Sequence, residues 1–217
     1  MKARKRPYKR RDPEGTKQAL LDAVSEILTE QGHHSLGVNR VALLAGVNKK
    51  MIYHYFSSYN NLLKNYIRGK DFWRPVLERF GSGNPPKTPE LPAYISHIFQ
   101  EQFSCFYNNP ELQQMILWQI CESHPLLREI SDERETHADP IARLTDVHFN
   151  GSGINFRAVL ALMLGGIYYV VWHANTNKSK ICGIDINNER DRLALQKAIR
   201  QVIDAVWKAA ESDKEIP

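Results

Sequence analysis

The stretch from Leu36 to Leu63, which reads LGVNRVALLAGVNKKMIYHYFSSYNNLL, decides the fold of the N-terminal part of the chain. Its first half has apolar residues at three- and four-residue steps, which is the pattern of a short amphipathic helix. These apolar residues are Val38, Val41, Ala42 and Ala45. Gly46 then stands where a helix end favours the left-handed conformation, and Asn48 is a suitable N-cap for a second short helix from Lys49.

The second short helix has two different faces when its residues are placed at about 100° per residue. The apolar face consists of Met51, Ile52, Tyr55 and Phe56. The opposite face is basic and aromatic and consists of Lys49, Lys50, Tyr53 and His54. Two short helices joined by a glycine-containing turn, the second with a basic outer face, are typical of a helix-turn-helix, whose second helix enters the major groove of DNA.

Within this stretch, AGVNKKMIYHYFSSYNNLL resembles the signature Ala-Gly-Val-Ser-x-x-x-Leu-Tyr-x-His/Tyr-Phe-x-x-Lys-x-x-Leu of the TetR family of bacterial transcriptional regulators. The residues that fall in register are Ala45, Gly46, Val47, Tyr53, Phe56 and Leu62. The sequence departs from the signature at two places. Asn48 replaces the usual Ser or Thr, which is conservative for an N-cap. Tyr59 stands where the family usually has a Lys that approaches a DNA phosphate.

The resemblance implies an all-α fold with a helix-turn-helix DNA-binding domain at residues 16–65 and a ligand-binding and dimerisation domain at 66–217. A basic arm at 1–15 precedes them, and it is expected to be disordered because it has almost nothing to bury. The resemblance further implies a repressor that binds a pseudo-palindromic operator in double-stranded DNA as a homodimer. A small-molecule ligand is expected to release it. The odd number of unclustered cysteines fits a reducing cytoplasm.

Lys49 and Lys50 lie in the first turn of the second short helix, where recognition helices meet base edges. A lysine there can donate to guanine or neutralise a phosphate. Other members of this set match family positions near the DNA backbone or lie close to the start of the preceding helix. The candidate DNA-binding residues are Asn39, Arg40, Asn48, Lys49, Lys50, Tyr53 and His54. The alternative is that they are only the exposed polar residues of an amphipathic helix.

The charge of the chain is unevenly distributed. Residues 1–70 hold 14 Lys and Arg against 5 Asp and Glu, whereas the remainder holds 15 against 19. This asymmetry indicates that the first part alone meets a polyanion. A non-specific DNA-coating protein, driven by the basic arm, is therefore a second interpretation of the same charge.

Several other classes are disfavoured by composition and motifs. No run approaches the roughly 18 apolar residues of a membrane span, and the basic start lacks the apolar stretch of a secretory signal. The three cysteines do not cluster with each other or with histidines, so we expect no metal site and no disulfide framework. No phosphate-binding loop, GxSxG or HExxH motif is present, so neither an enzyme nor a cofactor is expected. A helical small-molecule binder or enzyme with an incidental helix-turn-helix is the third interpretation.

We expect a first helix that begins near Pro13 and ends at Gly32. A fourth helix starts near Asn60 and must end or kink near Arg74, because Pro75 lies inside its apolar pattern.

Further elements follow from turn residues and apolar spacing. Residues 81–92 contain four Pro and two Gly, which indicates a loop. Helices are expected at 93–107 and from Asn109 to the break at His124-Pro125. Residues 126–148 are expected to form two short helices, separated at Asp139-Pro140, with the acids of 129–139, Arg134 and His137 on a solvated face.

The stretch Ile154–Ala174 is the most apolar helix, and it is expected to be buried on several sides. Gly165-Gly166 within it permits close approach by a neighbour. Together with Glu189–Glu211 it resembles the helix pair that forms the four-helix dimer interface of the family, so the homodimer is expected through these two helices.

The C-terminal part is rich in aromatic residues at helical spacing. Each of them belongs to a core more often than to a binding site, but as a set they suit a largely apolar cavity for an apolar ligand. The candidate ligand-binding residues are Phe103, Tyr107, Trp118, Tyr168, Tyr169 and Trp172.

Overall fold

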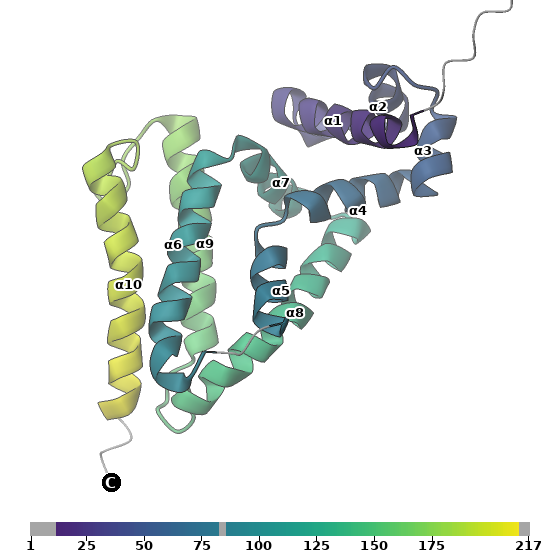
Figure 1. The fold of residues 1–217 in the computed structure, drawn as a ribbon. Coiled ribbons are helices and arrows are strands. Elements are labelled where there is room, and N and C mark those ends of the chain that lie inside the picture. The colour runs from purple at the N-terminus through teal and green to yellow at the C-terminus, as the bar shows by residue number, and fades with distance from the viewer. Residues whose placement is uncertain (1–11, 83–85, 213–217) are drawn as a thin grey trace, which may run out of the picture. The chain divides into compact units, whose positions relative to one another are not determined.

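The computed structural model describes residues 12–82 and 86–212, and their regular structure is helical apart from one isolated β-bridge. The prediction of an all-α fold is therefore confirmed. The chain divides into two compact units, one through Gly69 and one from Lys70, whereas the sequence placed this boundary after residue 65 (Figure 1). Residues 1–11 of the expected arm lie outside the described residues.

The first unit consists of short helices packed on α1. Its elements are α1 (Pro13–Gln31), the 3₁₀ turn η1 (His33–Ser35), α2 (Val38–Leu44), α3 (Lys50–Phe56) and α4 (Tyr59–Lys70), which crosses the boundary between the units. Pro13 opens α1, so the arm cannot extend to residue 15 as expected. The helix starts this early because Asp12 is its N-cap, and the Asp12 carboxylate accepts a hydrogen bond from the backbone N–H of Gly15 at 3.0 Å. As predicted, Gly32 ends the helix, with φ of 78°.

The fourth helix ends earlier than the sequence predicted. α4 stops at Lys70 and α5 (Trp73–Ser82) begins three residues later, whereas the break was expected near Arg74. Pro75 explains the position, because a proline ring in a helix clashes with the carbonyl four residues before it, which here belongs to Asp71. The Asp71 carboxylate then caps α5 by accepting the backbone N–H of Trp73 at 3.0 Å.

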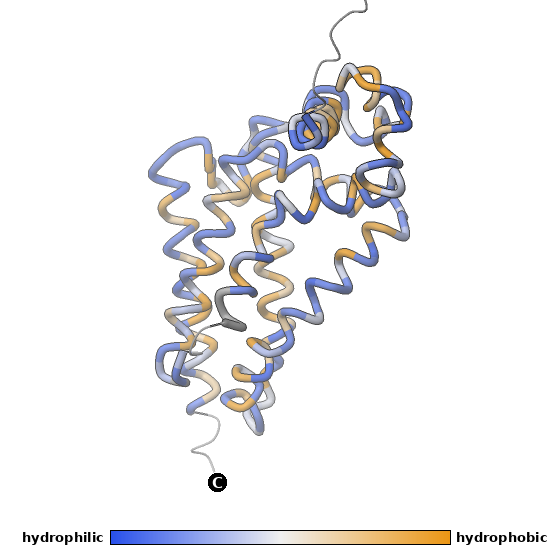
Figure 2. Tube along the Cα trace, turned by 45° about the vertical axis from the view of Figure 1, so that its right-hand side comes forward, coloured by the Kyte–Doolittle hydropathy of each residue, from blue (hydrophilic) through white to orange (hydrophobic). Residues whose placement is uncertain are grey.

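The second unit is built of longer helices around α6. Its further elements are η2 (Thr88–Glu90), α6 (Leu91–Asn108), α7 (Pro110–Cys121), α8 (Pro125–Phe149), α9 (Phe156–Asn177) and α10 (Glu189–Ser212). α6 packs against α7, α9 and α10, and α8 packs against α5, α9 and α10 (Figure 1). Apolar residues recur along these helices and form the core between them (Figure 2). Asn109 caps α7 as predicted, accepting the N–H of Leu112 at 2.9 Å.

Two expectations for this unit are wrong. The loop expected at 81–92 is shorter, because α5 extends to Ser82 and Pro92 fits the first turn of α6, where its missing N–H is not needed. Residues 126–148 do not form two helices, because α8 is continuous and contains Pro140. The carbonyl that Pro140 leaves without its helical bond is that of Thr136, and both residues are exposed, so solvent can take the place of the missing donor.

α9 also differs from the expectation of burial on several sides. Leu162 is 78% exposed, Tyr169 is exposed, and a Cβ added at Gly165 or Gly166 would meet no atom within 4 Å. By length and composition Phe156–Asn177 could cross a membrane, so the expectation that no run approaches such a span is wrong, although core helices of soluble proteins pass the same test. Within the chain, α9 therefore has one packed side and one open apolar side.

Candidate DNA-binding face and ligand cavity

The turn between α2 and α3 is a Schellman motif built on Gly46. The N–H of Val47 donates to the carbonyl of Ala42 at 3.0 Å, and the N–H of Gly46 donates to that of Leu43 at 3.1 Å. Gly46 has φ of 66°, a conformation that residues with a Cβ rarely adopt. The turn therefore reverses the chain tightly and sets the direction of α3.

Asn48 caps α3 as predicted, because its side-chain oxygen accepts the backbone N–H of Lys50 at 2.9 Å. The regular helix begins at Lys50, one residue later than expected, but Lys49 already has right-handed helical dihedrals. Both lysines thus lie in the first turn. Ile52, which follows them, is fully buried, so it anchors the opposite side of the helix in the core of the unit.

All the candidate DNA-binding residues have exposed side chains. They are Asn39, Arg40, Asn48, Lys49, Lys50, Tyr53 and His54. The apolar residues of α3 are buried or half-buried, as its two-faced pattern predicted. An exposed face with this composition can neutralise phosphates and donate hydrogen bonds to base edges.

Tyr59, which stands in place of the family's lysine, is held differently from these residues. Its hydroxyl is buried and has no hydrogen-bond partner in the structure. The loss of solvent around it raises the pKa of Tyr59 to about 12. Tyr59 therefore does not present its polar group to solvent.

The second unit contains a cavity of about 470 Å³. Side chains from α5, α6, α7, α8 and α9 line it, and most of them are apolar. Examples are Val76, Ile98, Phe99, Ile116, Leu160 and Leu164. Along α8 the lining runs from Ser131 to Thr145, which corresponds to about 21 Å at the helical rise. This volume and lining suit an elongated, largely apolar small molecule.

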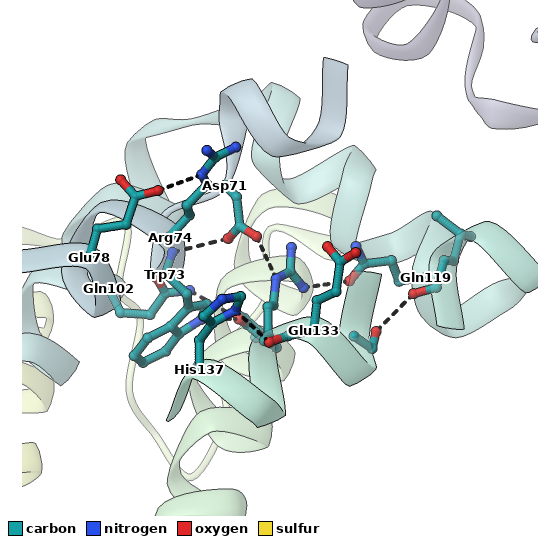
Figure 3. Close-up of polar contacts among 12 residues, drawn as sticks. Asp71, Trp73, Arg74, Glu78, Gln102, Gln119, Glu133 and His137 are labelled. Atoms are coloured by element: carbon teal, nitrogen blue, oxygen red, sulfur yellow. Dashed lines mark hydrogen bonds and ion pairs between the residues drawn. The ribbon is translucent and has the colours of Figure 1, made fainter. Parts of the chain in front are cut away.

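A buried polar cluster lies against this cavity (Figure 3). It is defined by Asp71, Gln102, Gln119, Arg134 and Tyr168. Arg134 Nε donates to Asp71 Oδ2 at 2.6 Å, and Arg134 Nη1 donates to Gln119 Oε1 at 3.0 Å. The side chains of this ion pair are only 17% (Arg134) and 5% (Asp71) exposed, so the pair is shielded from solvent.

Tyr168 completes the cluster from α9. Its hydroxyl oxygen accepts hydrogen bonds from Gln102 Nε2 at 3.0 Å and from Trp73 Nε1 at 3.4 Å. Burial raises the pKa of Tyr168, so its hydroxyl stays protonated. The cluster thus consists of two hydrogen-bonded groups, Asp71–Arg134–Gln119 and Gln102–Tyr168, and Trp73 donates to one member of each.

Another part of the lining is charged and open to solvent. Asp139 and Arg157 line the cavity and are 36% and 46% exposed, and Arg157 bridges Asp139 and Asp146. The neighbouring guanidinium groups of Arg143 and Arg157 lower the pKa of Asp139. This ion-pair network marks the side of the cavity nearer to solvent.

Of the six candidate ligand-binding residues, only Tyr168 lines this cavity. The other five lie elsewhere in the second unit. Phe103 is fully buried in the core, and Tyr169 is exposed on the open side of α9. Three are held by other groups: Tyr107 lies under Arg192, Trp118 donates to Glu122, and Trp172 donates to the carbonyl of Gln113.

The interpretation of Arg134 as part of a solvated helix face is wrong. Its ion pair with Asp71, 63 positions earlier in the chain, buries it. A signal was present in the small residues of α8 that recur at steps of seven, four and three residues, which places them on one side of the helix toward the cavity. These are Ser131, Ala138, Ala142 and Thr145. In the described part of the chain, no His, Cys, Asp and Glu side chains are grouped so that they could hold a metal ion.

Comparison with known proteins agrees with this architecture. Residues 20–66 match the family described as "Bacterial regulatory proteins, tetR family", and this segment contains α2, α3 and the turn between them. The chain is 22% identical to the HTH-type transcriptional repressor SCO4008 of Streptomyces coelicolor over 89% of its own length and 98% of that protein.

Solved structures share the fold at low sequence identity. One is the transcriptional regulator FadR of Bacillus subtilis in complex with stearoyl-CoA, with TM-score 0.59, 20% identity and coverage of 86% of this chain and 96% of that one. Another is NalD, the secondary repressor of the MexAB-OprM multidrug efflux pump in Pseudomonas aeruginosa, with TM-score 0.60, 20% identity and coverage of 88% and 96%. Residues 20–66 therefore form a DNA-binding domain of the tetR family of bacterial regulatory proteins, and the chain as a whole shares the fold of these regulators.

Proposed function

We propose that the protein is a ligand-responsive repressor that binds a pseudo-palindromic operator as a homodimer and is released by a largely apolar small molecule. The observation that carries this proposal is the presence in one chain of an exposed basic α3 face in the first unit and a mostly apolar cavity in the second. A ligand can bind more tightly to a conformation in which the two α3 helices of the dimer have the wrong separation for the operator. The operator affinity then falls by a factor set by the ratio of the ligand's affinities for this conformation and for the DNA-binding one.

The open apolar surfaces of α9 and α10 support the homodimer. On α9, Leu162, Gly165, Gly166 and Tyr169 lie on one side of the helix and are exposed. On α10, a second exposed or half-exposed stripe of small apolar residues consists of Ala194, Ala198, Val202, Ala205 and Ala209. Two such helices and their two-fold mates can form a four-helix interface, in which the glycines permit close backbone approach. One subunit's α3 reads only a few base pairs, and a dimer doubles that number.

The central experiment is a footprint on the DNA that flanks the protein's own gene, with the affinity compared between that site and scrambled DNA of equal length. We expect a two-fold symmetric footprint and a specific affinity at least roughly 10³ times the non-specific one. Equal affinity for both DNAs would instead favour the non-specific DNA-coating protein. Addition of largely apolar small molecules to the protein–DNA complex, with the loss of the footprint as the measurement, then tests the release step.

The dimer is tested by sedimentation of Leu162→Glu and Val202→Glu variants. Each places a charge on an open apolar stripe, where burial against a partner without a counter-charge costs several kcal/mol. We expect monomers that remain helical and bind the operator weakly. Val147→Glu is the matched control, because Val147 is 73% exposed on α8 and lies outside both stripes. Tight dimers of the first two variants would contradict this interface.

A further inference from the structure

The buried polar cluster offers hydrogen-bond donors to the cavity. Arg134 Nη2 and Gln119 Nε2 are buried nitrogen atoms without a partner in the structure, and both residues line the cavity. The Tyr168 hydroxyl oxygen already accepts two hydrogen bonds, so its own O–H remains available as a donor. All three residues that line the cavity at this cluster therefore present N–H or O–H groups. Gln102 Oε1, a buried acceptor of the cluster that also has no partner, belongs to a residue outside the lining.

These donors favour a ligand with an acceptor atom. A buried donor without an acceptor loses its hydrogen bonds to water and gains none in return. An oxygen on the ligand would supply the missing partner, whereas a purely apolar molecule would leave the donors unpaired. The rest of the lining, which is mostly apolar, would accept the remainder of the molecule.

The charge balance of the cluster argues against an anionic acceptor. The Arg134 charge is already matched by Asp71, whose carboxylate lies 2.6 Å from Nε and is buried. A carboxylate ligand would bring a second negative charge beside Asp71 without a second positive one, and burial of an unpaired charge is costly. The other arginine of the lining, Arg157, is matched by Asp139 and Asp146. An uncharged oxygen uses the same donors without this cost.

We propose, on the basis of the ligand-release function above, that the ligand is an uncharged, largely apolar molecule whose ketone or ester carbonyl oxygen is bound by Gln119, Arg134 and Tyr168. Asp71 and Gln102 act behind these residues as positioning groups. Asp71 holds the Arg134 guanidinium, and Gln102 fixes the Tyr168 hydroxyl. Asp71 is also the residue that selects against anions, because it neutralises Arg134.

The first test is calorimetric titration of the full chain with two probes of equal chain length, 2-decanone and decanoate, at neutral pH where decanoate is ionised. We expect 2-decanone to bind at least roughly tenfold more tightly, because only decanoate adds an unpaired charge. Equal or tighter binding of decanoate, or binding of neither probe, would overturn the proposal.

The second test removes the negative charge while keeping the fold. Asp71→Asn retains the oxygen that caps Trp73 and leaves Arg134 as an unmatched cation. We expect the preference to reverse in favour of decanoate. Glu78→Gln is the matched control, because it also removes one carboxylate charge. Glu78 lies on α5 outside the cavity lining, in an exposed ion pair with Arg74. The control variant should keep the preference of the unmodified protein, and an unchanged preference in Asp71→Asn would contradict the role of Asp71.

A third variant covers the case in which Asp71→Asn does not fold, as judged by circular dichroism. Gln119→Leu removes one of the three donors at similar volume, and we expect roughly tenfold weaker binding of 2-decanone. Unchanged binding would show that Gln119 does not contact the carbonyl.

Operator binding measured with the same probes separates this inference from the proposed function. If decanoate binds more tightly and releases the DNA, the function stands and this inference falls. If 2-decanone binds selectively without any change in operator affinity, the assignment of the cavity stands and the ligand-release function falls.

Discussion

The two units build their candidate sites in different ways. In the first unit, the candidate DNA-binding residues lie on two neighbouring short helices and the connecting turn, and all of them are exposed. In the second unit, the buried polar cluster joins residues from α6 to α9 with Asp71 at the start of α5. A surface site can therefore be altered without loss of the fold, whereas a buried site shares its residues with the core that supports it.

The largest expected effect lies in the second unit. Phe106 is fully buried, and its ring centroid lies 4.7 Å from that of Tyr168 and 5.5 Å from that of Trp172. Phe106→Ala should lower the free energy of unfolding by about 3–5 kcal/mol, because it removes buried contacts and leaves a void. Urea unfolding followed by tryptophan fluorescence measures this directly, since all four tryptophans lie in the second unit.

The matched change in the first unit is Tyr53→Ala, at an exposed aromatic residue of α3. It should alter the unfolding free energy, followed by circular dichroism, by less than about 0.5 kcal/mol. A similar loss of unfolding free energy in both variants would contradict the difference between an exposed and a buried site.

The next effect concerns DNA affinity. Lys49→Ala or Lys50→Ala should weaken binding to the operator by about 1–3 kcal/mol if the side chain contacts a base, without a change in unfolding free energy. Binding to operator and to scrambled DNA should be compared at the same salt concentration. An equal loss of affinity for both DNAs would indicate that the lysine contacts a phosphate and not a base.

A smaller effect is expected when a helix cap is removed in either unit. Asn48 and Asn109 each cap a helix by accepting one backbone N–H at 2.9 Å. Replacement by alanine should cost about 1 kcal/mol of stability in either case. Only Asn109→Ala should shift the unfolding midpoint reported by tryptophan fluorescence. Asn48→Ala should additionally weaken operator binding, because its cap holds the first turn of α3.

The smallest effect is expected at Tyr59. Because its buried hydroxyl has no partner, Tyr59→Phe should be neutral or stabilising by up to about 1 kcal/mol. The pKa of Tyr59 in the folded protein, about 12, exceeds its ordinary value of 10.0. Its contribution to stability is therefore complete below pH 10 and is lost as the pH rises toward 12.

Thermal unfolding of both proteins across this pH range tests that sign. The unmodified protein should lose more stability than Tyr59→Phe between pH 10 and 12. An identical pH dependence would indicate that Tyr59 is solvated in the folded protein.

Two prolines show where sequence patterns stop being sufficient. Pro75 lies inside an apolar pattern of helical spacing and Pro140 lies in a more polar stretch, and the sequence predicts that each interrupts a helix. Pro75 does so, four residues earlier than expected, because Asp71 supplies a new cap at the break. Pro140 does not, because α8 also packs on α5, α9 and α10, and the affected carbonyl belongs to Thr136, an exposed residue that solvent can reach. Local sequence alone cannot distinguish these cases, since the difference lies in which groups surround the missing bond.

The helix-turn-helix and its exposed basic face could be predicted from the amino-acid sequence alone. Each of its features depends on residues a few positions apart: the stripe of α2, the left-handed Gly46, the Asn48 cap and the two faces of α3. Such short-range interactions have the same geometry in any helix, so their spacing is sufficient to predict them.

The cavity and its polar cluster could not be predicted in this way, because they depend on contacts between distant parts of the chain. Arg134 has the sequence context of a solvated residue, and it is buried because Asp71, 63 positions away, matches its charge. Phe103 and Trp118 are aromatic residues of the type expected in a binding site, but they are buried outside the cavity lining. The physical reason is that a cavity is the space left where several helices meet, so its lining depends on how those helices pack and not on the spacing within any one of them.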